Sequence, residues 1–162
     1  MAESVCDTSP IQYLYQTNLL HLLPTLFGSV TVPEAVVREV AEGRKAGVSL
    51  PVLESLPWIV VGRPQQEVAL TLLQDLGAGE TEVLALALEH SGNLALLDDA
   101  IARGYAKQLG VKCIGTLGIL LKAKKSAELK VIAPILYDLD RLRFRLDPRT
   151  RTAVLKLAGE AD

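Results

Sequence analysis

The sequence predicts an α/β protein, a three-layer α/β/α sandwich with a mostly parallel central sheet. Two observations favour this class. Short apolar runs of strand length alternate with helix-like segments along the chain, and these runs are apolar throughout, as in strands that are covered on both faces. Ligands in such folds bind beyond the carboxyl ends of the strands, so functional residues are expected where the strands end.

Local signals justify the elements in chain order. The first strand is Val5-Cys6, because Ser9 is a good helix N-cap and Pro10 suits the first position of the helix-like run that follows. The later strands are apolar runs bounded by turn residues, at 30–32, 58–61, 94–97 and 111–114. Apolar residues at helical spacing predict helices at 19–27, 33–42, 67–73, 80–90, 99–109, 116–125, 130–140 and 148–157.

Length and composition set the outer limits. A chain of 162 residues, 49% of them hydrophobic, is long enough to bury a core as one unit, and we expect a single domain over 1–162. No apolar run approaches the ~20 residues that cross a bilayer, and the N-terminus lacks a secretory signal, so we expect a cytoplasmic protein without a membrane partner. Cys6 and Cys113 lie in apolar segments, which favours buried free thiols over a disulfide or a metal site.

Charge is distributed unevenly. The net charge of −2 argues against a simple polyanion binder, but residues 1–111 carry 6 Lys and Arg against 13 Asp and Glu, whereas residues 112–162 carry 11 against 6. This pattern suits a metal site beside a surface that contacts a polyanion. Taken alone, the pattern is more typical of solvated helix faces.

Acidic residues follow two of the predicted strands directly. Asp7 lies in the turn after the first strand, where an aspartate that only caps the turn is an equally good reading. Asp98 and Asp99 follow the strand at 94–97. One of this pair can cap the next helix, but capping does not require both.

Two glutamates lie on helices. In Gly77-Ala78-Gly79-Glu80, Glu80 falls on the buried face of its helix, and it either caps the helix or points into a site, whereas Glu82 and Glu89 are expected to be solvated. Glu39 lies on the shoulder of the apolar stripe of the helix at 33–42. Taken alone, Glu39 is more typical of a surface residue than of a ligand.

Several converging carboxylates with no histidine nearby indicate a hard divalent cation, Mg²⁺ or Mn²⁺. Such a cation activates water and neutralises charge on a phosphodiester undergoing displacement. His21 and His90 lie far from these motifs, and the sequence contains no Ser-His-Asp set, P-loop or dinucleotide fingerprint. A receiver domain also clusters aspartates on an α/β/α fold, but it places its acidic pair after the first strand, unlike this chain.

The order of the motifs resembles the PIN-domain family, in particular its bacterial stand-alone branch related to toxin ribonucleases of toxin–antitoxin pairs. The resemblance rests on "CDTSPIQYL", "LLHLLPTLFGSVTVPEAVVREV", "LGAGETEVLALALE" and "LALLDDAIARGYAKQLGVKCIGTLGILLKAKK", and it extends to about Gly159. It implies a PIN-like fold and a Mg²⁺- or Mn²⁺-dependent endoribonuclease that acts on RNA. It also implies a homodimer and a small antitoxin partner.

Motif by motif, the resemblance makes Asp7, Glu39, Glu80 and the pair Asp98 and Asp99 the catalytic acids. Asp7, Glu80 and Asp99 would hold the metal, since the Thr-x-Asp pattern of toxin relatives favours Asp99 over Asp98. Thr8, Ser9 and Thr116 are supporting candidates. The chain departs from the pattern at Glu80, where Asp is commoner, and at Leu97, which replaces the threonine. A catalytically weak or inactive PIN-like module that binds RNA or metal is therefore the alternative.

Overall fold

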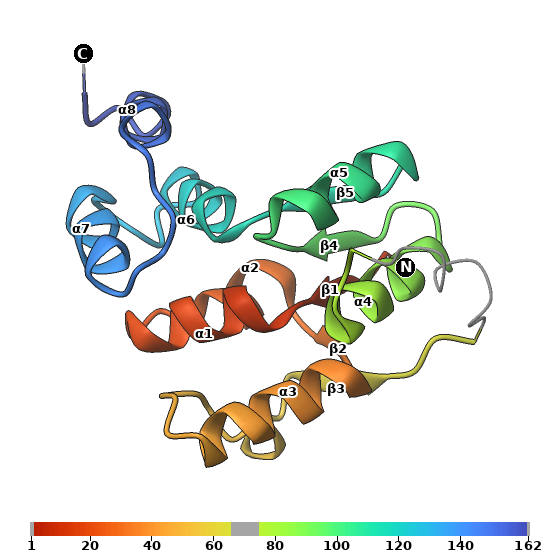
Figure 1. The fold of residues 1–162 in the computed structure, drawn as a ribbon. Helices are drawn as coiled ribbons and strands as arrows, with labels where there is room; N and C mark the ends of the chain where they lie inside the picture. The colour runs from red at the N-terminus through yellow and green to blue at the C-terminus, as the bar shows by residue number, and fades with distance from the viewer. Residues whose placement is uncertain (1, 66–74, 162) are drawn as a thin grey trace.

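A five-stranded, all-parallel sheet forms the centre of the protein (Figure 1). The computed structural model describes residues 2–65 and 75–161, so the helix predicted at 67–73 lies outside the described residues. The strands are β1 (Ser4–Cys6), β2 (Val30–Pro33), β3 (Ile59–Gly62), β4 (Leu94–Leu96) and β5 (Lys112–Ile114), in the spatial order β3-β2-β1-β4-β5. Strands β2 and β3 are added in turn on one side of β1, and β4 and β5 are added on its other side. The direction of strand addition therefore reverses between β1 and β4, which is the position where open α/β sheets bind ligands.

Strand register brings the residues that follow the central strands together. Cys6 pairs with Leu96, and Leu96 pairs with Ile114. The pairing continues one step further, because the Asp7 N–H donates to the Leu96 carbonyl at 3.1 Å and the Leu97 N–H donates to the Ile114 carbonyl at 3.0 Å. The turns after β1, β4 and β5 therefore lie side by side at the carboxyl edge of the sheet.

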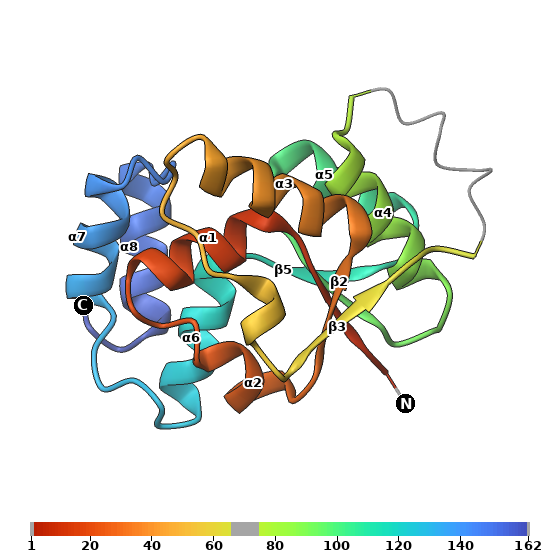
Figure 2. The same ribbon diagram turned by 90° about the horizontal axis from the view of Figure 1, so that it is seen from below.

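Helices cover both faces of the sheet, which confirms the predicted three-layer α/β/α architecture (Figure 2). On one face α4 contacts β1, β2 and β4 and lies between α3 and α5, while α2 and α6 lie on the other face and α1 contacts both α3 and α6. The helices are α1 (Thr8–Gln16), α2 (Leu22–Phe27), α3 (Glu34–Lys45), α4 (Ala78–Leu88), α5 (Ala100–Gln108), α6 (Thr116–Lys125), α7 (Ala133–Arg141) and α8 (Pro148–Leu157).

The core consists of the strands and the helix faces that meet them. Val5, Cys6 and Leu96 are fully buried in the sheet, and Leu84 and Ile119 bury the inner faces of α4 and α6. The long connection between α3 and β3 is anchored by Leu50 and by Leu53 of the short 3₁₀ helix η1 (Leu53–Ser55), both of which are buried. Both cysteines are free, as predicted, although Cys113 is only partly buried.

Three local predictions were wrong. The expectation that every strand is covered on both faces fails for β3, where Val60 and Val61 are 50% and 55% exposed because β3 is an edge strand. Helix α1 begins at Thr8, with Asp7 rather than Ser9 at the N-cap position. The helix predicted at 19–27 begins only at Leu22.

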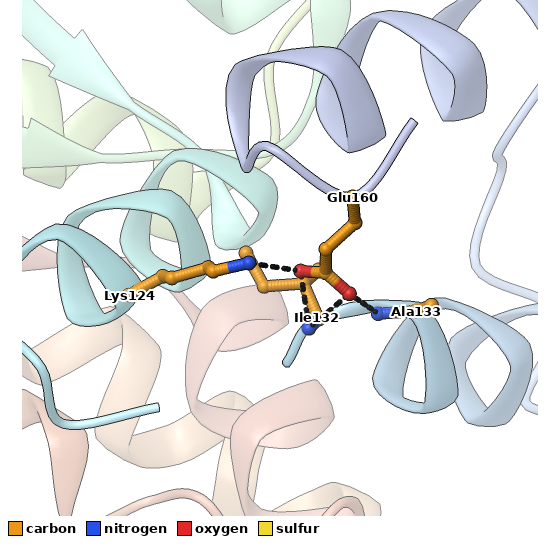
Figure 3. Close-up of polar contacts among 4 residues, drawn as sticks. All are labelled: Lys124, Ile132, Ala133 and Glu160. Atoms are coloured by element: carbon orange, nitrogen blue, oxygen red, sulfur yellow. Dashed lines mark hydrogen bonds and ion pairs between the residues drawn. The ribbon is translucent and has the colours of Figure 1, made fainter. Parts of the chain in front are cut away.

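The C-terminal segment is tied to α6 and α7 through Glu160 (Figure 3). The Glu160 carboxylate accepts hydrogen bonds from the backbone N–H groups of Ile132 and Ala133, at 2.8 and 3.1 Å, and pairs with Lys124 Nζ at 2.7 Å. These bonds lower the pKa of Glu160. Glu160 therefore caps α7 from outside that helix. Across the described chain, no helix has the length and apolar character needed to span a membrane.

Candidate active site at the carboxyl edge of the sheet

Asp7 lies at the centre of the carboxyl edge, directly after β1. Its side chain is 5% exposed, although it occupies the N-cap position of α1. An aspartate at this position commonly accepts a hydrogen bond from the N2 or N3 backbone N–H. Asp7 makes no such side-chain capping bond. Capping therefore does not account for a buried carboxylate at this position.

The environment of Asp7 disfavours its ionised form. The pKa of Asp7 is raised from 3.8 to about 7, mainly by burial and also by the nearby Glu80, Glu39 and Asp98 carboxylates, while the Thr8 backbone N–H offsets part of the rise. Negative charges close together in a poorly solvated place destabilise one another. The same three acids were singled out from the sequence, and the fold brings them close enough to Asp7 to repel its charge.

Glu39 reaches the edge from α3 and is held by two donors. Its Oε2 accepts from the Thr8 hydroxyl at 2.7 Å, and its Oε1 accepts from the Gly79 N–H at 3.1 Å. Position 79 must be glycine for this approach, because a Cβ there would lie 2.8 Å from both carboxylate oxygens of Glu39. Glu39 thereby joins α1, α3 and the start of α4, and it is not the surface residue that its helix alone suggests.

Glu80 stands at the start of α4 and is half-buried. Its Oε2 accepts from the Gly77 N–H at 3.1 Å, so the side chain folds back over the first turn of its own helix. Burial raises the pKa of Glu80, the Gly77 N–H counters this, and the Asp99 and Glu39 carboxylates add to the rise. Glu80 therefore caps α4, as one of the two sequence readings had it, and it also lies near other acids, while its role in a site stays a prediction.

Asp98 is fixed by the start of α6. Its Oδ1 accepts from the Thr116 N–H at 2.6 Å, and its Oδ2 accepts from the fully buried Thr116 hydroxyl at 2.7 Å. Burial raises the pKa of Asp98, and the Thr116 hydrogen bonds and the Arg103 guanidinium offset part of that rise. A Cβ at Gly115 would lie 2.7 Å from Asp98 Oδ1, so glycine is needed there as well.

Asp99 has a different environment from its neighbour. Its Oδ1 accepts from the Ala102 N–H at 2.9 Å and caps α5, and the residue is exposed. Asp98 raises the pKa of Asp7, whereas Asp99 acts on Glu80. The sequence-based preference for Asp99 over Asp98 as the metal ligand stays a prediction, and the buried surroundings of Asp98 favour the reverse order.

A cleft of about 910 Å³ opens beside these acids. Glu80, Asp98 and Asp99 lie on one part of its wall, and Ser9 also lines it. Three arginines line the same cleft: Arg103 of α5 and Arg143 and Arg145 of the connection between α7 and α8. Tyr13 and Phe144 also contribute, with their rings edge to face at a centroid separation of 5.0 Å. The lining of the cleft therefore combines acidic and basic side chains.

The donor chemistry suits a hard divalent cation, although the side chains are turned to other partners. Within residues 2–65 and 75–161 no group of three or more His, Cys, Asp or Glu side chains is arranged to hold a metal ion. Glu39 and Asp98 each use both oxygens in hydrogen bonds. Oxygen donors are nevertheless those that Mg²⁺ and Mn²⁺ prefer, and a cation would relieve the repulsion around Asp7.

Fold and site together define a class: a doubly wound α/β protein with a carboxylate cluster where such sheets bind their ligands. The family model DUF3368, described as a PIN domain, matches residues 3–160, so the chain belongs to the PIN-domain family. This confirms the resemblance seen in the sequence. The fold is of the nuclease type, since PIN domains are typically nucleases that act on RNA and generally use divalent metal ions. No curated protein matches the chain significantly.

Several residues of the site were missed from the sequence. Gly79 and Gly115 leave room for the carboxylates of Glu39 and Asp98. In the sequence, the only indication of these roles is that Gly79 directly precedes Glu80 and Gly115 directly precedes Thr116. Glu82 is not the solvated residue predicted, because its Oε2 accepts from the Ala35 N–H at 2.8 Å and caps α3. Glu89 is exposed, as predicted, and accepts a hydrogen bond from the Gln65 N–H at 2.7 Å.

Proposed function

We propose that the protein is a Mg²⁺- or Mn²⁺-dependent endoribonuclease that hydrolyses RNA phosphodiesters. One observation carries the proposal: Asp7 is buried without a capping bond among Glu39, Glu80 and Asp98, at the carboxyl edge of the sheet and beside a cleft lined with arginines. A structural core gains nothing from carboxylates that repel one another. A site that binds a cation requires them.

Asp7, Glu80, Asp98 and Asp99 are the side chains proposed to hold the cation. A bound divalent ion would supply an activated water and would neutralise charge on the reacting phosphate. The protein contributes the rest through its own contacts. Thr116 fixes Asp98, and Thr8 and Gly79 fix Glu39, so two of the acids are held by donors on neighbouring elements.

Cleavage of a labelled RNA in Mn²⁺, Mg²⁺ or EDTA tests this proposal. We expect cleavage with either metal and none in EDTA, and we expect Asp7→Asn to abolish it while the protein stays folded. Glu39→Gln and Glu42→Gln form a matched pair on α3, because Glu42 is exposed and outside the cluster. Only Glu39→Gln should impair cleavage. Undiminished cleavage in EDTA, or equal loss in both glutamine variants, would contradict the proposed site.

A second candidate is a PIN-like module that binds RNA or metal without turnover. The observation in its favour is that Glu39, Glu80 and Asp98 already have hydrogen-bond partners, which a ligating carboxylate would have to share. This alternative predicts RNA binding, or Mn²⁺-dependent stabilisation, in wild type with no cleavage under any metal condition.

We further propose a cytoplasmic toxin that forms a homodimer and is inhibited by a small antitoxin. The support is the resemblance of the motifs to toxin ribonucleases, together with free thiols at Cys6 and Cys113. Induced expression of wild type should arrest bacterial growth, and Asp7→Asn should not. Normal growth under wild-type expression, from a culture whose purified protein cleaves RNA, would count against the toxin role alone.

A further inference from the structure

The α7–α8 connection carries two arginines into the cleft, about forty-five residues downstream of Asp99, the last acid of the proposed site. Arg143 and Arg145 are both exposed, and Phe144 between them packs against Tyr13 of α1. The aromatic contact anchors the connection to α1, the helix whose N-cap residue is Asp7. Arg143 and Arg145 therefore flank in sequence a residue, Phe144, that is packed against α1, and all three line the cleft.

Arg143 and Arg145 form no ion pair with any residue that the structure describes. Among the residues that the structure describes, the ion pairs within 4.0 Å are Lys124 with Glu160 and Arg151 with Asp140. Arg103, on α5, lines the same cleft and is likewise outside these pairs. Three guanidinium groups in one cleft repel each other, and each presents donors that match a phosphate.

Arg143 also occupies a strained backbone position. Its φ is +67°, and it follows α7 at the position where the chain turns left-handed, with the Phe144 N–H donating to the Leu139 carbonyl at 3.0 Å. Glycine is the residue best suited to that conformation. Elsewhere in the chain the left-handed position after a helix is filled by Gly47, Gly110 and Gly159 after α3, α5 and α8, and by Asn18 and Ala127 after α1 and α6. Arginine is thus a costly choice at 143 for the fold alone.

We propose that Arg143 and Arg145, with Arg103 nearer the acids, bind phosphates of the RNA strand next to the bond to be cut. The inference rests on the proposed function and assigns its substrate-binding side. Lys122, Lys124 and Lys125 belong with Arg143 and Arg145 to the basic segment 112–162, but they do not line the cleft, and Lys124 is paired with Glu160. The basic half of the chain is therefore divided into a binding part and a structural part.

Binding of a fluorescent twelve-residue oligouridylate in EDTA tests this assignment without cleavage. Arg143→Gly with Arg145→Gln should weaken binding at least tenfold and reduce the slope of log affinity against log salt by about 1.4, since a single strand loses about 0.7 per phosphate contact. Arg38→Gln with Arg44→Gln removes the same charge from α3, outside the cleft, and should leave the slope near the wild-type value.

The thermal melt separates binding from folding. Because glycine relieves the left-handed strain, Arg143→Gly should melt at or above the wild-type temperature while binding RNA more weakly. Arg145→Gln alone, at an unstrained position, should lower the salt slope by about 0.7. Unchanged affinity and slope in the double variant, or no RNA binding by wild type, would overturn the assignment. If the variant loses binding but wild type never cleaves RNA with metal, the assignment of Arg143 and Arg145 to phosphate binding stands. In that case only the ribonuclease proposal fails.

Discussion

Replacing Asp7 by asparagine should stabilise the metal-free protein above pH 7, although it removes a group from the proposed site. In the fold the pKa of Asp7 rises from 3.8 to about 7, mainly because the carboxyl is buried. The folded state therefore holds the proton more tightly than the unfolded chain. The stability that this proton contributes is fully present below about pH 4, is lost as the pH rises to about 7, and is then constant.

The magnitude follows from the size of the shift. A difference of about three pKa units corresponds to roughly 4 kcal/mol at about 1.4 kcal/mol per unit, which is the penalty for ionising Asp7 in the folded state. Asparagine has nearly the same shape and no charge, so the variant avoids that penalty. Wild type should lose up to roughly this amount of unfolding free energy between pH 4 and pH 8, relative to the variant.

Urea denaturation in EDTA at pH 4, 6 and 8 measures this difference, and Asp138→Asn, an exposed change on α7, is the control. Added Mn²⁺ should then stabilise wild type by about 2.7 kcal/mol at a hundredfold excess over Kd and stabilise Asp7→Asn much less. If Asp7→Asn is less stable than wild type at pH 8 in EDTA, and Mn²⁺ stabilises neither protein, the carboxylate is a structural cap and the reasoning fails.

Three further outcomes can be measured in the same assays. Thr116→Val keeps the buried shape but removes the hydroxyl that donates to Asp98. It should lower the unfolding free energy measured in urea by roughly 1.5–3 kcal/mol and reduce RNA cleavage. A variant as stable and active as wild type would show that this hydrogen bond is dispensable. Gly79→Ala should displace Glu39 from its two donors and impair cleavage with a near-normal melt, and full activity would mean that Glu39 is not needed in that position. Glu160→Gln should lower the melting temperature at pH 7 but not at pH 3. The lowered pKa of Glu160 means that its carboxylate stabilises the fold at neutral pH, and this stabilisation is lost as the pH falls. An equal effect at both pH values would contradict this linkage.

The sequence was sufficient to predict the layers and the edge on which the acids lie. Val5-Cys6 and Leu94–Leu96 are apolar on both faces, so they had to be interior strands, and parallel pairing then places Asp7 and Asp98 side by side. The strand register determines which residues lie next to each other at the edge of the sheet, and the burial of each strand fixes that register. Strand geometry thus accounts for Asp7 and Asp98, whereas Glu39 entered the predicted cluster only through the resemblance to the PIN-domain family.

Contacts between elements distant in the sequence could not be predicted in the same way. Whether Asp98 or Asp99 turns inward depends on the Thr116 N–H, which comes from another strand and helix. The helical wheel places Glu82 away from the buried face of α4, but α3 packs there and offers the Ala35 N–H. The charge pattern marked the basic segment 112–162 but not which of its residues line the cleft, because only the folded α7–α8 connection carries Arg143 and Arg145 there.

Four helices begin at the edge where the carboxylates collect, which gives that edge a positive potential of its own. Asp7 stands at the start of α1, Glu80 at the start of α4, Asp99 at the start of α5, and Asp98 against the first residue of α6. The aligned peptide dipoles of a helix place roughly half a positive charge at its N-terminus. The backbone therefore offsets part of the negative charge before any cation arrives, so a chelator should empty the site without unfolding the protein. The proposed cation could then leave and return while the sheet beneath the acidic edge stays intact.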